Sequence, residues 1–401
     1  MDYEGAIASI APLWDLDGDG EVYRAAGLKN WDDESLVAAI GKGSHLNGYV
    51  IRADWSTGDW SKLSDAKINI HDVQRSYGAA ASYSYSYDAF WTPQAGETYQ
   101  ETDVATGAAL VEHAVPSDAK DVNHVQPIED DARAVFSSRM TNAIIKGEAR
   151  SGEALWVLGG DDGEFSIEAP SGEVHAAGYS YWRGQHNAQY IGDGEYAMFD
   201  NNYDHEDEGS RMLIVSVDED AYEAKIEWEY DVDTYSKVFG DNDRLPTGNL
   251  LGCWWQSSTY AHDDAYDAKV VELVRASSEV AFELEVSSDR GCSAAASPCS
   301  VDGTWLLYSV EKFYTAPLIA NVTCDGDALA FLAWDTYKAT SAYPGSYTVY
   351  DDDGALRASG SFDFAAYWRT TTVSVADAAL SSGSVLVENR WGSSASVEFT
   401  C

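Results

Sequence analysis

Hydrophobic and polar residues alternate in short runs along most of this chain, which is the pattern of antiparallel β-strands. Between residues 46 and 317 these runs are separated by turn signals such as Thr-Gly and Ser-Gly pairs. The turns at Gly58, Gly107 and Gly152 recur at intervals of roughly 45–50 residues, the period of four-stranded propeller blades. The pattern therefore predicts a β-propeller, and about five or six blades fit the available length. A β-sandwich of similar size is the competing architecture.

The two ends of the chain differ from this central region. Residues 1–45 are expected to form an irregular N-terminal lead-in with one short helix near residues 32–40. Residues 318–401 alternate cleanly, as in Ser346–Tyr350 and Arg369–Val375, and predict a small β-sandwich of the immunoglobulin or fibronectin type. The expected fold is thus all-β, with a propeller over residues 46–317 followed by the sandwich.

Net charge is the most extreme feature of the composition. The 401 residues include 67 Asp and Glu against 25 Lys and Arg, which gives a net charge of −42. Such a field repels nucleic acid and anionic membranes, so an anionic ligand would need a local basic pocket. A solvated acidic surface suited to saline surroundings is the simplest interpretation. No apolar run approaches the roughly 20 residues that span a bilayer, so no membrane span is expected.

Four of the five cysteines fall into two pairs that suggest disulfides. Cys292 and Cys299 bracket a loop of small residues, and Cys324 and Cys401 bracket the C-terminal segment as a staple would. Cys253 lies in an apolar run and is expected to be an inert core residue. Disulfides indicate an oxidising compartment, although the first residues do not resemble a signal peptide. We therefore expect a secreted or extracytoplasmic protein whose targeting segment is missing from this sequence.

One short acidic segment resembles half of a calcium loop. Asp15, Asp17 and Asp19 occupy the first three ligand positions of such a loop, and Gly20 follows them. Ala26 stands where an EF-hand supplies its bidentate glutamate. A structural calcium site is therefore one hypothesis, and an acidic turn is the simpler one.

Three histidines recur at matching points of the strand pattern. His71, His124 and His186 each lie just ahead of the innermost strand of a predicted unit. A repeat that places one imidazole in each of three consecutive units can direct all three toward a common axis. The other five histidines are interpreted as ordinary packed or surface residues: His45, His113, His175, His205 and His262.

An arginine near the second histidine bears on the kind of site that the imidazoles form. Arg139 follows His124 by 15 residues, on the second strand of the same predicted hairpin. Three imidazoles alone would suit zinc. Imidazoles together with a guanidinium form a cradle for an anion, such as a transferring sulfuryl or phosphoryl group.

Three segments resemble the arylsulfotransferase family. They are the stretch from His124 through Ser-Ser-Arg-Met-Thr-Asn-Ala-Ile-Ile to Gly160, the stretch from Gln-His-Asn-Ala to Trp228-Glu-Tyr, and the stretch from Gly240 to Leu251. The similarity covers about residues 46–350. Residues 305–317 and the predicted sandwich after them resemble the secreted branch of the family.

This resemblance implies a six-bladed propeller that moves a sulfuryl group from a phenolic sulfate ester to another phenol without the nucleotide donor PAPS. It implies that His186 is transiently sulfurylated and that His124, His71 and Arg139 complete the catalytic site. Small aromatic sulfate esters and phenols would be its ligands, and no cofactor would be needed apart from a structural calcium ion, if one is bound.

Two positions that the resemblance places at the substrate depart from the family's pattern. Gln126 stands where the family has Asn, and Asn187 stands where it has Asp. Because these changes bear on activity, the alternative function is a secreted or surface-displayed binding propeller that has lost the transferase reaction.

Overall fold

The structure is a computed structural model, and it is built almost entirely from β-strands. It describes residues 24–32, 35–42, 48–54, 57–63, 68–76, 89–94, 98–103, 106–232, 234–256, 266–287, 306–325, 328–335, 338–376 and 381–401. Within these ranges the only helical segments are two short 3₁₀ turns, η1 (Arg139–Thr141) and η2 (Glu206–Glu208). None of the described helices has the length and apolar character that a membrane crossing needs.

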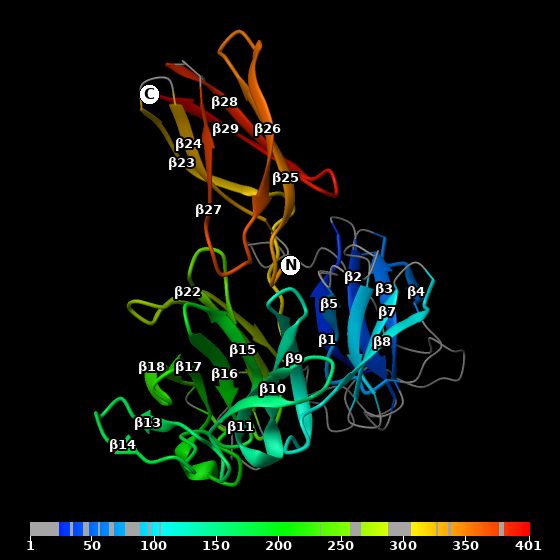
Figure 1. Ribbon diagram of the computed structural model, residues 1–401, viewed down its shortest axis with the longest axis vertical. Helices are drawn as coiled ribbons and strands as arrows, with labels where there is room; N and C mark the ends of the chain where they lie inside the picture. The colour runs from blue at the N-terminus through cyan, green and yellow to red at the C-terminus, as the bar shows by residue number, and fades with distance from the viewer. Residues whose placement is uncertain are drawn as a thin grey trace. The chain divides into compact units, whose positions relative to one another are not determined.

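The chain divides into two compact units. The first comprises residues 1–29 and 36–311, and the second comprises residues 30–35 and 312–401. In the first unit the described strands form five sheets in chain order (Figure 1). Each contains four strands that lie side by side in sequence order, and the fourth sheet has two further strands. This succession of four-stranded meanders is the architecture of a β-propeller.

The first sheet holds β1 (Arg24–Asn30), β2 (Ser35–Gly41), β3 (Gly48–Asp54) and β4 (Trp60–Lys62). The second holds β5 (Gln74–Ser76), β6 (Ala89–Pro93), β7 (Thr98–Asp103) and β8 (Ala109–Ala114). The third holds β9 (Val122–Ile128), β10 (Arg133–Ser138), β11 (Ala143–Glu148) and β12 (Ala154–Leu158).

The fourth sheet holds β15 (His186–Gly192), β16 (Glu195–Asp200), β17 (Arg211–Asp218) and β18 (Glu223–Asp231). Two short strands extend its outer edge, β13 (Ser166–Glu168) and β14 (Val174–His175). The fifth sheet holds β19 (Asp241–Arg244), β20 (Leu250–Trp255), β21 (Ala268–Val274) and β22 (Glu279–Val286).

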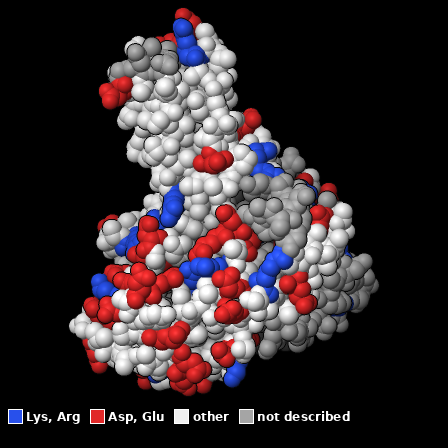
Figure 2. All heavy atoms as spheres, viewed as in Figure 1, with Lys and Arg blue, Asp and Glu red and all other residues white. Residues whose placement is uncertain are grey.

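Burial explains why the inner and outer strands have different sequences. β10 and β16 are buried along nearly their whole length, since neighbouring sheets pack on both of their faces. The outer strand β18 instead alternates exposed Glu and Lys with apolar residues such as Ile226. Carboxylates of this kind appear widely over the face drawn in Figure 2.

Hydrogen bonds between the inner strands link each sheet to the next. The backbone N–H of Gly27 donates to Ile70 O at 3.2 Å, which joins the first sheet to the chain entering the second. The amide of Asn123 on β9 donates to Gln185 O at 2.7 Å, at the start of β15. The amide of Gln189 on β15 donates in turn to Asn242 O on β19 at 3.0 Å.

An extended segment, residues 306–311, closes this ring. Gly240 N donates to Tyr308 O at 3.1 Å, and the Ser309 hydroxyl donates to Ala26 O at 2.9 Å. The segment therefore lies between the fifth sheet and the first, where the inner strand of a sixth blade would run. The described residues show five full blades, and the count of six stays a prediction.

The structure corrects two expectations about the N-terminal region. The helix expected near residues 32–40 is wrong, because β2 covers Ser35–Gly41 and pairs within the first sheet. The irregular lead-in of residues 1–45 is likewise wrong from Arg24 onward, where β1 begins. Almost every residue of β2 is buried, and a continuous apolar run fits a buried strand as well as a helix.

The second unit is a small sandwich of two sheets. One sheet holds β23 (Leu318–Asp325), β24 (Ala328–Trp334) and β27 (Thr371–Val375). The other holds β26 (Leu356–Phe364), β25 (Tyr343–Tyr350), β28 (Ser382–Asn389) and β29 (Ser394–Thr400), in that spatial order. The C-terminal sandwich predicted from the strand pattern is thus present.

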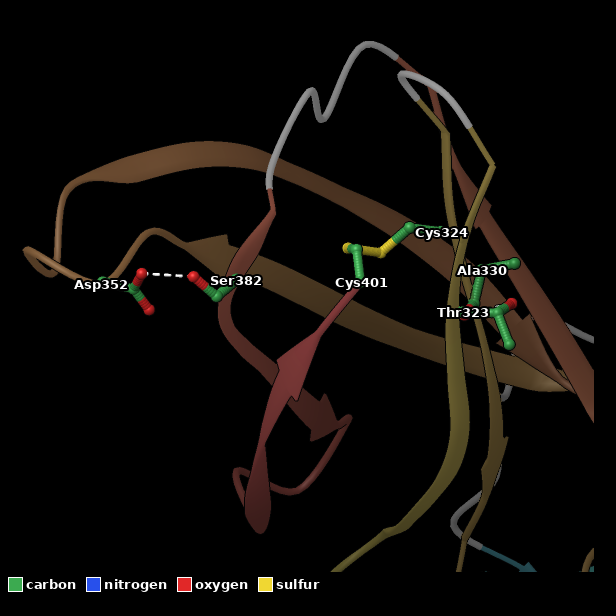
Figure 3. Close-up of a disulfide and its surroundings, with 6 residues drawn as sticks. All are labelled: Thr323, Cys324, Ala330, Asp352, Ser382 and Cys401. Atoms are coloured by element: carbon green, nitrogen blue, oxygen red, sulfur yellow. Dashed lines mark hydrogen bonds between the residues drawn. A yellow bond between two sulfur atoms is a disulfide. The ribbon is translucent and has the colours of Figure 1, made fainter.

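The cysteines follow the prediction wherever the structure describes them. Cys324 on β23 is bonded to Cys401, just after β29, with a Cα–Cα distance of 5.4 Å (Figure 3). Cys253 is free and buried on β20, and burial raises the pKa of its thiol well above the usual value. It is therefore an inert core residue. Cys292 and Cys299 lie outside the described residues.

Candidate active site

His186 is the most tightly held of the three repeated histidines. It is the first residue of β15, and its side chain is 3% exposed. Its Nδ1 lies 2.6 Å from Oδ1 of Asn201, the first residue after β16. The backbone N–H of Phe239 donates to its Nε2 at 3.2 Å. Because Asn201 also donates through Nδ2 to the carbonyls of Ser236 and Phe239, its Oδ1 must be the atom that faces the imidazole.

These bonds determine the tautomer of His186. Oδ1 of Asn201 can only accept, so Nδ1 carries the proton, and Phe239 N–H can only donate, so Nε2 carries a lone pair. Burial lowers the pKa of His186 to about 3, against the opposing effect of the Asn201 hydrogen bond, and the charges of Arg139 and His71 lower it further. The side chain is therefore a neutral imidazole with a basic nitrogen at neutral pH.

His124 lies on β9 with a different partner. Its side chain is 6% exposed, and its Nδ1 lies 3.2 Å from Oδ2 of Asp72. Burial alone would raise the pKa of Asp72, but the imidazole of His124 and the backbone N–H of Val125 hold it below the usual value. Nε2 of His124 is buried and has no hydrogen-bond partner among the described residues. A buried nitrogen without a partner is suited to a ligand.

The rings of His71 and His186 both lie close to the ring of Tyr308. His71, directly before Asp72, has its ring centroid 6.1 Å from that of Tyr308, and His186 lies 6.1 Å from the same ring. The Tyr308 hydroxyl donates to Asn123 O at 3.3 Å, next to His124. The Tyr308 ring thus lies near the imidazoles of both His71 and His186, and burial raises the pKa of Tyr308 well above the usual value.

Arg139 belongs to the same site. It starts η1, directly after β10, and its guanidinium bonds Oδ2 of Asp121 through both Nε and Nη2 at 2.7 Å. Its charge adds to the effect of burial in lowering the pKa of His186, and it opposes the larger effect of burial, which raises the pKa of Tyr308. The structure therefore brings His71, His124, His186 and Arg139 into one cluster, and their catalytic roles stay predictions.

Gln126 and Asn187 were expected to contact the substrate. In the structure their side chains form hydrogen bonds with the backbone. Gln126 accepts from Tyr190 N at 2.6 Å and donates to Tyr190 O at 3.0 Å, which ties β9 to β15. Asn187 has φ of 51°, a left-handed conformation that Asn adopts more readily than most residues, and its amide donates to Gly240 O at 3.4 Å. These contacts give both residues structural roles, and their contact with substrate stays a prediction.

The remaining candidates lie elsewhere. His113 stacks on Trp91 and bonds Glu101, His175 stacks on Tyr179, and His205 bonds Glu208. His45 and His262 lie outside the described residues, as do Asp15, Asp17 and Asp19 of the calcium hypothesis. No group of His, Cys, Asp and Glu in the described part of the chain has a geometry that could hold a metal ion.

Comparison with known proteins identifies the family of the chain. The model of the arylsulfotransferase (ASST) family matches residues 83–295, which is more than half of the chain. The chain belongs to the arylsulfotransferase family. No curated protein matches it.

Several solved structures are distantly similar to this arylsulfotransferase-family chain. Hydrazine synthase of Kuenenia stuttgartiensis is 12% identical, with 83% of this chain and 81% of that chain covered and a TM-score of 0.38. The β-propeller domain of Myceliophteria thermophila Cps50 (Swd1) is 11% identical, with 68% and 79% covered and a TM-score of 0.37. The periplasmic gluconolactonase of Pseudomonas aeruginosa is 11% identical, with 63% and 68% covered and a TM-score of 0.36.

Sequence reasoning did not identify four groups that surround the histidines of this candidate site. They are the side chains of Asp72, Asn201 and Tyr308 and the backbone N–H of Phe239. One signal was present, since Asp200 and Asn201 directly follow the apolar run Tyr196–Phe199, where a buried polar group needs a specific partner. Tyr308 lies in a segment without a strand pattern, so no local signal indicated it.

Proposed function

We propose that this protein transfers a sulfuryl group from a phenolic sulfate ester to another phenol, with His186 as the nucleophile and without a nucleotide donor. The observation that carries the proposal is the neutral, buried imidazole of His186, whose proton is fixed on Nδ1 by Asn201. A nucleophile held in one tautomer and orientation needs little reorganisation to attack.

In the first half of the reaction, Nε2 of His186 attacks sulfur while the bond from sulfur to the aryl oxygen breaks. The leaving phenoxide takes a proton from Nε2 of His124, the buried nitrogen without a described partner. Asp72 faces the other ring nitrogen and stabilises the imidazolium form that donates this proton. In the second half, the acceptor phenol returns a proton to His124 as its oxygen takes the sulfuryl group from His186.

In this mechanism, Arg139 and the backbone N–H of Phe239 stabilise the negative charge on the sulfuryl oxygens. When Nε2 bonds sulfur, it can no longer accept from Phe239 N–H, so this donor is left facing the sulfuryl oxygens. Phe239 has φ of 70°, a conformation that bulky residues rarely adopt, and strained backbone of this kind is common at functional sites. Asn201 holds the strained residue by donating to its carbonyl at 2.8 Å.

The test uses nitrophenyl sulfate as donor, with and without phenol. Release of nitrophenol that depends on phenol supports the transferase, whereas release without phenol indicates a sulfatase and no release indicates a binding protein. His186→Ala should abolish transfer while leaving the thermal unfolding curve close to that of the wild type. An active His186→Ala protein would refute the covalent mechanism, as would the absence of a sulfonated His186 peptide in protein quenched after donor is added.

The alternative of a binding propeller loses its main support in this structure. It rested on Gln126 and Asn187, and both side chains have backbone partners that account for their identity. We also propose that the protein works outside the cytoplasm, since the Cys324–Cys401 disulfide is compatible with an oxidising compartment.

A further inference from the structure

Two cations lie against one tyrosine beside the candidate active site. The Arg139 guanidinium is 5.4 Å from the centroid of the Tyr203 ring, and Nζ of Lys237 is 5.6 Å from it. Both distances are within the range of a cation–π interaction. The Tyr203 ring is half-buried, so part of it is open to solvent.

The two cations differ in how their charge is balanced. Arg139 is paired with Asp121, which offsets its charge in the resting protein. Lys237 has no carboxylate within ion-pair distance among the described residues, and its ammonium lies over the Tyr203 ring. An unbalanced lysine is unexpected where Asp and Glu outnumber Lys and Arg by 67 to 25. This imbalance suggests that Lys237 has an anionic partner that comes from outside the chain.

Lys237 is also held close to the nucleophile. Its neighbour Ser236 accepts a hydrogen bond from Asn201 at 2.8 Å, and Phe239, two residues further on, donates to His186 at 3.2 Å. The loop that carries Lys237 is therefore fixed at two points to the pair of His186 and Asn201. An anion bound at Lys237 would lie beside the site where the sulfuryl group transfers.

We propose that Lys237 and Tyr203 form the subsite that captures the aryl sulfate donor. This inference rests on the proposed transferase function and adds the residues that select its anionic substrate. The ammonium of Lys237 attracts the sulfate ester, and the Tyr203 ring offers a face for the aryl group. The acceptor phenol is neutral and makes no use of the cation, so the subsite separates donor from acceptor by charge.

The physical need for such a subsite follows from the net charge of −42. A monoanionic ester approaching this protein is repelled at long range, and a local cation reverses the potential only over roughly the Debye length, about 8–10 Å at moderate salt. Lys237 supplies this local charge, because the charge of Arg139 is offset by Asp121.

The test is two-substrate kinetics on Lys237→Gln, Lys237→Arg and Tyr203→Leu at several salt concentrations. Lys225→Gln is the matched control, since it removes the same charge from an exposed lysine on β18 that pairs with Glu227. We expect Lys237→Gln to raise the donor KM about tenfold, the loss of one charge-assisted contact, with kcat and the phenol KM unchanged. Lys237→Arg should stay within about threefold of the wild type, because it keeps the charge. Tyr203→Leu should raise the donor KM, and the control should match the wild type.

Calorimetric titration with nitrophenyl sulfate separates this inference from the proposed function. A wild-type protein that binds the ester through Lys237 but shows no turnover would refute the transferase and support the subsite. Equal donor affinity, KM and salt dependence in the wild type and Lys237→Gln would overturn the subsite while leaving the transferase intact. A rise in donor KM in Lys225→Gln equal to that in Lys237→Gln would also overturn it, because it would assign the effect to net charge alone.

Discussion

Lowering the pH from 7 to 5 should destabilise this protein through His186. In an unfolded chain an imidazole has a pKa of about 6.5, whereas burial lowers the pKa of His186 in the folded protein to about 3. Between these two values the unfolded chain binds a proton that the folded protein excludes. The contribution of His186 to stability is therefore fully present above pH 6.5 and is lost progressively as the pH falls toward 3.

The size of this effect follows from the shift itself. Each pH unit inside the interval changes the free energy of unfolding by about 1.4 kcal/mol, so the loss from pH 7 to pH 5 is about 2 kcal/mol. No discount for solvent screening applies, because His186 is only 3% exposed. The full interval down to pH 3 corresponds to a loss on the order of 4 kcal/mol.

Urea denaturation at pH 7, 6 and 5 measures this loss in the wild type and in His186→Gln. The C-terminal sandwich is the same in both proteins, so the difference between them isolates the imidazole. The wild type should lose about 2 kcal/mol more than His186→Gln over this range. His205→Gln, which removes a histidine outside the site, should lose as much as the wild type. Parallel losses in the wild type and His186→Gln would refute the reasoning, as would an NMR titration of His186 with a midpoint near 6.

Three further substitutions test other parts of the structure. Arg139→Ala should lower kcat about 10²- to 10³-fold if the guanidinium stabilises the transferring group, and an unchanged rate would place it outside the chemistry. Asp72→Asn should slow transfer from phenyl sulfate on the order of a hundredfold, yet slow nitrophenyl sulfate far less, because nitrophenolate leaves without a proton from His124; equal slowing of both esters would contradict this role. Cys401→Ser should reduce the stability of the sandwich by about 4 kcal/mol, since its disulfide closes a loop with a sequence separation of 77, and an unshifted unfolding transition would contradict this.

The blades could be predicted from sequence because their strands follow simple patterning. Turns at Gly58, Gly107 and Gly152 all adopt positive φ, between 67° and 76°, which is why glycine recurs there. Prediction failed at β2, where Ser35–Gly41 is almost completely buried and shows no alternation. A strand packed on both faces gives no period of two, so the run could not be distinguished from a helix.

The site could be predicted only as far as its repeated members. His71, His124 and His186 fall in successive units, and this repetition indicated a common site. In the structure they lie near the first strand of each unit but not at one equivalent position, because His71 precedes β5, His124 lies within β9 and His186 begins β15. Asn201 and Tyr308 are not part of this repeat. Tyr308 lies beside His71 in the structure, although 237 positions separate the two residues in the sequence. Contacts of this kind exist only after the ring has closed, so no local pattern can reveal them.

The identities at Gln126 and Asn187 show a second limit. From sequence, each was a departure from the family that bore on activity. In the structure Gln126 makes two bonds to the backbone of Tyr190, and Asn187 adopts φ of 51° directly after His186. Both positions are constrained by backbone geometry, which the one-dimensional pattern does not contain.

Neutral amide side chains both join neighbouring sheets and hold His186 in the candidate site. Neutral amides bridge successive sheets at Asn123, Gln126 and Gln189, and another amide, Asn201, holds His186. An amide donates and accepts at once and carries no charge, so it can be buried near the axis at far lower cost than an ionised group. In a chain of net charge −42, carboxylates at these points would repel both one another and an anionic substrate. Amides at the inner strands therefore join the sheets of a strongly acidic protein without adding charge beside the histidine cluster.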